Sequence, residues 1–191
     1  MKKLAFLILI LLCLGWAVSC PSQREEERED TETTLSPEVD LKNLIERAEM
    51  KTYRDADYDV EVCYPDFFVV CDTAEDGTAR FYYPNENKKE ISLIMFVEPN
   101  IEGWNIHEAV ENLSDSMNIC IEEGEDYFIF SSQSIGTRMC ILEKCFLIDD
   151  QWIDYTLYYH LKYSNDIGRL LDMVKEWNPR TNAASKEKTN E

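Results

Sequence analysis

The sequence predicts a single α+β domain whose largely antiparallel sheet, of about six strands, is sandwiched by helices. Its 191 residues suit one domain with tails. The composition, 45% hydrophobic and 12% aromatic, provides enough apolar surface for a core although 30% of the residues are charged. Periodic segments follow one another in the order helix, strands, helix, strands and helix, which favours this fold class.

A helix and a strand begin the predicted domain, which extends over residues 36–178. The Ser-Pro-Glu sequence at 36–38 is typical of a helix start, and apolar residues at helical spacing follow it to Ala48. From Asp57 to Tyr64, polar and apolar residues alternate, as in a strand with one wet face near the edge of a sheet.

A hairpin and a central strand come next. Residues 67–72 and 79–83 flank a turn-like Glu-Asp-Gly sequence, which predicts two strands joined by a short loop. Residues 91–97 are apolar at both odd and even positions, which predicts a strand that is covered on two faces and lies at the centre of the sheet.

A helix, three strands and a final helix form the second half of the domain. Asn105 and Glu108 have the spacing of a capping box, and apolar residues continue at helical spacing to Met117. Three alternating segments predict an antiparallel meander, namely residues 126–131, 137–147 and 152–161. The last helix is expected between Ser164 and Pro179.

Residues 1–19 predict a secretory signal peptide. A Met-Lys-Lys start precedes an apolar run from Leu4 to Leu14 and a small-residue ending, Ala-Val-Ser. The apolar run is shorter than the roughly 20 residues that a membrane-spanning helix needs. Together with Cys20, the ending resembles a bacterial lipoprotein box, which implies cleavage before Cys20 and acylation of its thiol and its new amino group. An ordinary secreted protein cleaved nearby is the alternative.

Residues 20–35 predict an acidic tether between the lipid and the domain, because they contain six acidic residues and no apolar cluster. The same run resembles the export signal of surface lipoproteins in the Bacteroidetes, so a sorting signal is the second interpretation. We expect a lipid-anchored protein of the cell envelope, on the periplasmic or the surface-exposed leaflet of the outer membrane. Residues 179–191 are expected to form a polar tail.

The charge restricts the partners. There are 38 acidic and 19 basic residues, and the net charge is −19. A field of this sign repels the phosphates of nucleic acid and anionic lipid headgroups, so a nucleic-acid partner is excluded. Removal of residues 1–19 would take away two lysines and no acid, which makes the mature chain more acidic still. Acyl chains on Cys20 would hold such a chain on a membrane without basic residues, since each buried methylene contributes roughly 0.8 kcal/mol.

Five cysteines fall within the predicted domain, so they cannot all form disulfides with one another. Cys63 and Cys71 flank one short segment and are expected to form a local disulfide. Cys140 and Cys145 are expected on opposite faces of one strand, because they are separated by an odd number of residues. No cysteines have the spacing of a zinc site, and the other thiols are expected to be buried and free.

Three segments are similar to Mog1/PsbP-like domains. They are D-V-E-V-C-Y-P-D-F-F from Asp59, K-C-F-L-I-D-D-Q-W-I-D-Y-T-L-Y-Y from Lys144, and I-G-R-L-L-D-M-V-K-E-W from Ile167. They resemble the first strand, a late hairpin and the last helix of that family, over roughly Tyr53 to Trp177. The family includes a Ran-binding protein and photosystem accessory proteins, so the resemblance implies its fold and a noncatalytic role in binding. An exported bacterial lipoprotein would meet neither Ran nor a photosystem, so the partners do not transfer.

Candidate binding residues lie on one face of the last strand and in one loop. Trp152, Tyr158 and His160 share a strand face, and Trp104 follows a glycine in a predicted loop. They are predicted to form a binding surface, and the alternative is that this face lies under a helix or simply faces solvent. The H-E-A-V-E sequence at His107 lacks the second histidine of a zinc-protease motif, so His107 is expected to face solvent.

No G-x-S-x-G, P-loop or G-x-G-x-x-G motif occurs. We therefore expect a noncatalytic interaction domain, with no cofactor and no metal, that binds an unknown protein or other macromolecule. Two alternatives stay open: an acidic inhibitor or immunity protein that neutralises a basic toxin, and an unrecognised hydrolase. Salt-sensitive capture of a basic partner would indicate the inhibitor. A deep polar pocket with perturbed carboxyl groups would indicate the hydrolase.

Replacing Cys20 tests the lipid anchor. Cys20→Ala is expected to move the protein from the membrane fraction to the soluble fraction, because the variant has no thiol for acylation. Cell fractionation and immunoblotting measure this, with Cys13→Ala as the matched control because Cys13 lies in the predicted signal peptide. Membrane association of Cys20→Ala equal to that of the control would contradict the assignment.

Overall fold

The structure of the chain is a computed structural model that describes residues 40–73, 78–84 and 90–179. The predicted signal peptide, Cys20, the acidic tether and residues 180–191 of the predicted tail lie outside these ranges. Within them, no helix combines the length and the apolar character that crossing a membrane requires.

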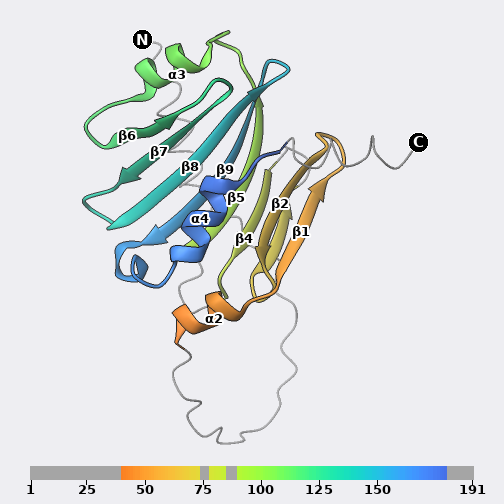
Figure 1. Cartoon of the computed structure of the whole chain (residues 1–191), viewed down its shortest axis with the longest axis vertical. Helices are drawn as coiled ribbons and strands as arrows, with labels where there is room; N and C mark the ends of the chain where they lie inside the picture. Colours follow the sequence, from red (N-terminus) through yellow and green to blue (C-terminus); the bar gives the residue numbers. More distant parts are fainter. Residues whose placement is uncertain (1–39, 74–77, 85–89, 180–191) are drawn as a thin grey trace, which may run out of the picture. The chain divides into compact units, whose positions relative to one another are not determined.

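A seven-stranded antiparallel sheet forms the body of the domain, in the order β3-β4-β5-β9-β8-β7-β6 (Figure 1). Its strands are β3 (Val69–Thr73), β4 (Thr78–Tyr82), β5 (Ile91–Pro99), β6 (Asn118–Glu123), β7 (Tyr127–Gln133), β8 (Met139–Ile148) and β9 (Gln151–His160). The predicted α+β class with a largely antiparallel sheet is confirmed. The β3–β4 hairpin, the internal position of β5 and the β7–β8–β9 meander are confirmed as well.

The helix predicted to reach Met117 is shorter in the structure, and a strand that the sequence did not predict, β6, follows it. Helix α3 (Ile106–Leu113) begins at the predicted capping box of Asn105, but it ends before Met117. Asp115 Oδ1 accepts hydrogen bonds from the backbone N–H groups of Met117 (2.7 Å) and Asn118 (2.8 Å). Such an aspartate turn competes with helix, so the helical spacing of apolar residues continued past the true end of α3.

A separate hairpin, β1 (Met50–Asp55) and β2 (Val60–Pro65), forms a two-stranded antiparallel sheet. The sequence predicted one strand from Asp57, but Asp57 and Tyr58 lie in the turn between β1 and β2. Asp55 Oδ1 accepts hydrogen bonds from the backbone N–H groups of Asp57 (2.9 Å) and Tyr58 (3.2 Å). The alternation of residues was right for β2 and gave no sign of β1, whose residues are mostly polar or exposed.

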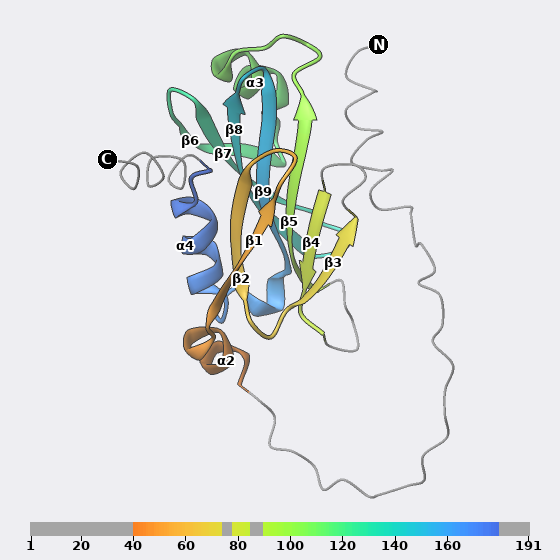
Figure 2. The ribbon, with the colours of Figure 1, turned by 90° about the vertical axis from the view of Figure 1, so that its right-hand side faces the viewer.

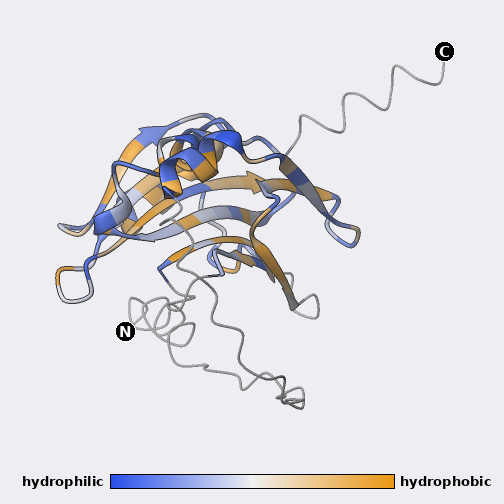
Figure 3. Ribbon diagram, turned by 90° about the horizontal axis from the view of Figure 1, so that it is seen from below, coloured by the Kyte–Doolittle hydropathy of each residue, from blue (hydrophilic) through white to orange (hydrophobic). Residues whose placement is uncertain are grey.

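Two helices and the β1–β2 hairpin cover one face of the main sheet (Figures 1 and 2). The helices are α2 (Leu41–Arg47) and α4 (Gly168–Glu176), and a 3₁₀ turn, η2 (Leu161–Tyr163), follows β9. Asp40 caps α2, while the start predicted at residues 36–38 lies outside the described ranges. The core below them contains fully buried side chains: Ile45, Phe81, Leu93, Met95, Tyr155, Leu157 and Leu170. In Figure 3 the strands carry most of the hydrophobic colour.

Polar side chains join the elements of the covering layer to the sheet and to one another through backbone carbonyls. The buried Tyr155 hydroxyl of β9 donates to the Cys63 carbonyl of β2, and Trp177 Nε1 donates to the Glu61 carbonyl (2.8 Å). Arg169 of α4 donates to three carbonyls at the end of α2, those of Ile45 (2.7 Å), Glu46 (3.0 Å) and Ala48 (3.0 Å). These bonds satisfy carbonyls of the covering layer that have no partner strand in the main sheet.

A lysine, Lys144 of β8, also points into this covered face. It is buried, and its Nζ donates to the Lys175 carbonyl near the end of α4 (2.6 Å). The same Nζ lies 4.6 Å from the centre of the Tyr127 ring and 5.2 Å from that of Phe146. Burial lowers the pKa of Lys144. A helix-end carbonyl and two aromatic rings compensate part of its desolvation.

Removing the Tyr155 hydroxyl tests how the hairpin is held. Tyr155→Phe is expected to lower the free energy of unfolding by about 1–3 kcal/mol, because the Cys63 carbonyl loses its donor inside the protein. Urea denaturation measures the change. The matched control is Tyr58→Phe, at a residue that is 38% exposed, and it is expected to stay within about 0.5 kcal/mol of the wild type. Equal effects of the two substitutions would contradict the assignment.

Candidate functional site

The second face of the main sheet is covered by α3 over one end only. Ile106, Ala109 and Val110 of α3 pack there against Phe128 and other buried side chains of β7, β8 and β9. Over the rest of this face, the two core clusters include no side chain of a described helix or hairpin, although Asp154 and Thr156 are themselves buried. We call this part the open face. Its side chains alternate along β4, β5, β8 and β9 with those of the core: Arg80, Ile94, Phe96, Glu98, Glu143, Asp154, Thr156 and Tyr158.

Trp152 belongs to the core under α3, which corrects its predicted place on a binding surface. It is 7% exposed, and its ring centre lies 5.9 Å from that of Phe128. Trp104 packs beside the same cluster and is partly buried. Its backbone N–H donates to Asn100 Oδ1 (3.0 Å), and Asn100 Nδ2 donates to its carbonyl (2.9 Å). The two tryptophans therefore support the α3 end, which is the alternative that the sequence left open.

Tyr158 and His160 lie toward the other end of β9. Residues 152 and 160 are separated by about 26 Å along an extended strand, so the four predicted residues form no single cluster. Tyr158 is half-buried on the open face, between Ser92 and Ile141 of the neighbouring strands. His160 Nδ1 accepts a hydrogen bond from the backbone N–H of Lys162 (3.1 Å) and caps η2. Of the four, Tyr158 is placed on the open face itself.

Three carboxyl groups meet on adjacent strands of the open face. Asp154 lies on β9, with Glu98 on β5 and Glu143 on β8. Glu98 pairs with Trp152 and Glu143 pairs with Thr156, so each glutamate is a diagonal neighbour of Asp154. Diagonal neighbours on one face lie about 7–8 Å apart at their backbones, within reach of long side chains. We call Glu98, Glu143 and Asp154 the carboxyl cluster.

Within the described ranges, the carboxyl cluster has no paired cation, and Asp154 at its centre is buried. Asp154 is 9% exposed, and its Oδ1 accepts no hydrogen bond. Its contact is with the thiol of Cys145, directly opposite on β8. Among the described residues, the ion pairs involve Arg54, His107 and Lys162, and none of them includes the cluster.

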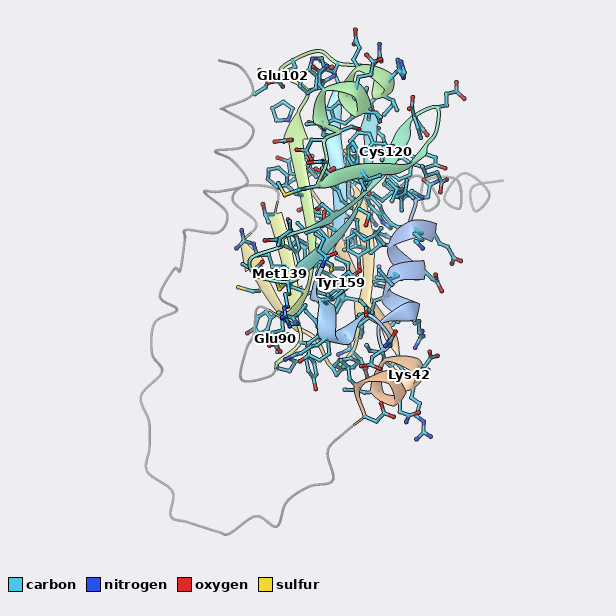
Figure 4. The ribbon with its side chains drawn as sticks, turned by 90° about the vertical axis from the view of Figure 1, so that its left-hand side faces the viewer. Lys42, Glu90, Glu102, Cys120, Met139 and Tyr159 are labelled. Carbon is cyan, nitrogen blue, oxygen red and sulfur yellow. The ribbon has the colours of Figure 1, made fainter. Side chains whose placement is uncertain are left out.

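Burial therefore favours the protonated acids. It raises the pKa of Asp154 well above its usual range, and the negative charges of Glu143 and Glu98 add to the shift. Burial, with the charge of Glu98, raises the pKa of Glu143 to about 7. Burial also raises the pKa of Glu98, and Glu102 adds to it from the α3 end of the sheet (Figure 4).

Glu90, at the opposite end of the sheet, shows what partners do to a carboxyl group (Figure 4). It accepts hydrogen bonds from Lys162 Nζ (2.7 Å) and the Tyr163 hydroxyl (2.6 Å). These two bonds lower the pKa of Glu90, in contrast to the raised pKa values in the cluster. On the open face, the basic residue Arg80 of β4 pairs with Ile94. Its buried Nε has no hydrogen-bond partner, as is also the case for Asp154 Oδ1.

The five cysteines within the described ranges are free thiols, so the predicted Cys63–Cys71 disulfide is not formed in the structure. Cys63 lies on β2 of the small hairpin, beside Thr52, and Cys71 lies on the edge strand β3 of the main sheet. Spacing along the chain suggested a pair because it does not show that the two strands belong to different sheets. Cys145 packs under α3, while Cys140 contacts Tyr159 on the other side of β8, so their opposite faces are confirmed.

His107 faces solvent, as predicted, and lies between two acids of α3 and β6. Its Nδ1 is 3.1 Å from Glu123 Oε1 and its Nε2 is 3.4 Å from Glu111 Oε1. The hydrogen bond to Glu123 raises the pKa of His107, and the charge of Glu111 adds to it. Across the described residues, no three histidine, cysteine or acidic side chains are grouped so that they could hold a metal ion.

Sequence reasoning missed the carboxyl cluster as a group. The strand parity of the last strand did place Asp154 on the same face as Tyr158. It gave no sign that Glu98 and Glu143 would lie on the two strands beside it. The signal that was available is an acidic residue within each of three apolar strands, where an unpaired charge is costly.

No family model matches the chain, and no curated protein matches it. Among solved structures, it is similar to the cyanobacterial PsbP protein CyanoP from Synechocystis sp. PCC 6803, with 14% identity, a TM-score of 0.47, and coverage of 67% of this chain and 90% of that chain. It is also similar to a protein of unknown function from Pseudomonas aeruginosa, with 11% identity, a TM-score of 0.34, and coverage of 75% and 96%. At these values neither likeness carries a function to this chain, and the α+β assignment rests on the strand order.

The carboxyl cluster predicts that stability falls as pH rises. Glu143 loses its proton at about 7 in the folded protein and near 4.5 when unfolded, so the folded state binds more protons between these values and is destabilised as pH rises through them. Glu143→Gln is expected to be of order 2 kcal/mol more stable than the wild type at pH 8 and equal to it at pH 4. Thermal unfolding from pH 4 to 8 measures this, with Glu176→Gln on the exposed side of α4 as control. A pH-independent difference would contradict it.

Proposed function

We propose that this chain is a lipid-anchored protein of the cell envelope, attached through an acylated Cys20, whose domain binds a protein or other macromolecule without catalysing a reaction. Residues 20–35 would hold the domain away from the outer membrane. The signal-peptide pattern and the lipoprotein-like box at Cys20 support the anchor. The open face is proposed as the binding surface.

The main support for the binding role is that α3 covers only one end of the second face of the sheet. Ile94, Phe96 and Tyr158 are half-buried side chains on a face where no described helix packs. Contiguous apolar side chains with polar groups among them are typical of interaction sites. On the other face of the same strands, α2, α4 and the β1–β2 hairpin provide a closed layer. A partner on the open face would take the place that these elements have on the covered face.

The raised carboxyl pKa values favour the hydrolase as a second candidate. Glu143, with a pKa of about 7, has the property of a general acid near neutral pH. Substrate turnover that stops in Glu143→Gln would select a hydrolase, whereas a stable complex without turnover would select the binding role. The acidic inhibitor is a form of the binding role in which the partner is a basic toxin.

Tyr158 tests the open face as a binding surface. Tyr158→Ala is expected to weaken capture of the partner from native membranes about tenfold or more, because a central aromatic at an interface often contributes more than about 2 kcal/mol. Affinity capture with quantitative mass spectrometry measures this, and thermal unfolding confirms that the variant is folded.

The matched control for that experiment is Tyr58→Ala, in the β1–β2 turn on the covered side of the sheet. It is expected to capture the partner as the wild type does. Equal loss in the two variants, or equal retention in both, would reject the open face as the site.

A further inference from the structure

We infer that the open face holds a binding site for an alkylammonium group, as a lysine side chain carries, formed by Asp154, Glu98, Glu143 and the ring of Phe96. This inference rests on the proposed function, since it names the chemical group that a partner presents to the same face. The proposed binding surface thereby gains a ligand class and the residues that bind it.

The strand register brings these four residues together. Asp154 lies between the two glutamates, one strand away from each. Phe96 of β5 lies directly opposite Asp154 and is half-buried. Three acidic groups and an aromatic ring on one small area of a sheet are the surroundings in which an ammonium group is stabilised, by charge and by its attraction to the ring.

The unsatisfied oxygen of Asp154 points to a ligand independently of the charge. This residue is nine-tenths buried, yet Oδ1 has no hydrogen-bond partner, which is rare for a buried polar atom. Lys144, the buried charge of the covered face, has a carbonyl and two rings around it. The same sheet thus gives Lys144 partners on its covered side and leaves one buried carboxyl oxygen of Asp154 without a hydrogen bond on its open side.

An ammonium group suits this arrangement better than a guanidinium group. It is a compact charge with three N–H donors, so it can bond to Asp154 while it lies near the negative charges of Glu98 and Glu143. A guanidinium group is planar and forms its best contact with one carboxylate through two parallel bonds. Glu98 and Glu143 are partly exposed and would meet the ligand first, while Asp154 would accept a bond from below.

Protons compete with the ligand for the cluster. The acidic groups that face Glu143 are Glu98 and Asp154, Glu102 acts on Glu98, and the thiol of Cys145 faces Asp154. Among the described side chains of this face, Arg80 lies two strands from Asp154, and His160 lies at the far end of β9. Because no cation is paired with the acids, an incoming ammonium displaces protons from them. Its affinity is expected to fall from pH 8 to pH 6.

Calorimetric titration of the full chain with two blocked tripeptides, Gly-Lys-Gly and Gly-norleucine-Gly, tests this inference. The norleucine side chain has the four carbons of the lysine side chain and lacks its ammonium group. At pH 8 the lysine peptide is expected to bind at least tenfold more tightly than the norleucine peptide, and its binding is expected to release protons. n-Butylamine is the third probe: binding equal to that of the lysine peptide indicates a free amine as the source, and weaker binding indicates a lysine in a protein.

The variants Asp154→Asn and Glu143→Gln are each expected to weaken the lysine peptide at least tenfold, and Glu176→Gln is expected to leave it unchanged. Glu98→Gln, at a partly exposed residue, provides a further variant if Asp154→Asn does not fold. Equal affinity for the two peptides, no binding of either, or unchanged affinity in the folded cluster variants would overturn the inference.

The two proposals fail differently. Partner capture that depends on Tyr158 but is the same in Glu143→Gln would keep the binding function and reject the ammonium site. Binding of the lysine peptide with no partner captured by the wild type would keep the site and reject the macromolecular partner.

Discussion

The pairing of β9 with β5 and β8 is the constraint on which the rest of the domain depends. β9 is hydrogen-bonded to both neighbours along its whole length, from Gln151 to His160 or Tyr159. Because successive side chains of a strand point to opposite faces, this register decides for three strands at once which residues are core and which belong to the open face. A shift by one residue would place Asp154 in the core and Tyr155 outside it.

The two faces of the sheet treat polar groups differently. On the covered face, the Tyr155 hydroxyl, the Trp177 indole and the Lys144 ammonium each bond to a backbone carbonyl of the covering layer. On the open face, Asp154 Oδ1 and Arg80 Nε lack such partners. On the covered face the covering layer thus supplies partners for buried polar groups, whereas two buried polar atoms of the open face lack a hydrogen bond. That difference is the physical basis of the proposed binding role.

The acidity of the chain acts at two scales. A net charge of −19 gives the molecule a long-range field that attracts cationic partners and repels nucleic acid. The carboxyl cluster concentrates the same sign of charge where burial makes it costly, which the raised pKa of Glu143 expresses. The first effect is screened by salt, whereas a bond to Asp154 inside the sheet would be screened much less. Salt dependence therefore separates attraction at a distance from recognition at the site.

The sequence alone determined the order of the elements, because apolar periodicity and capping residues are local. It predicted the capping box at Asn105, the β7–β8–β9 meander and the last helix. It missed β1 because the residues of that strand are mostly polar or exposed. It missed β6 because the Asp115 turn before this strand ends the helix through hydrogen bonds that periodicity does not reveal.

Only the tertiary structure decided which surfaces are covered and which residues meet. Trp152 and Tyr158 have the same strand parity, yet α3 covers the first and leaves the second on the open face. Cys63 and Cys71 are near in sequence and lie in different sheets, whereas Glu98 and Glu143 are distant in sequence and flank one aspartate. Parity assigns a side chain to a face, but the strand order and the position of one helix determine its neighbours, and these depend on contacts between residues far apart along the chain.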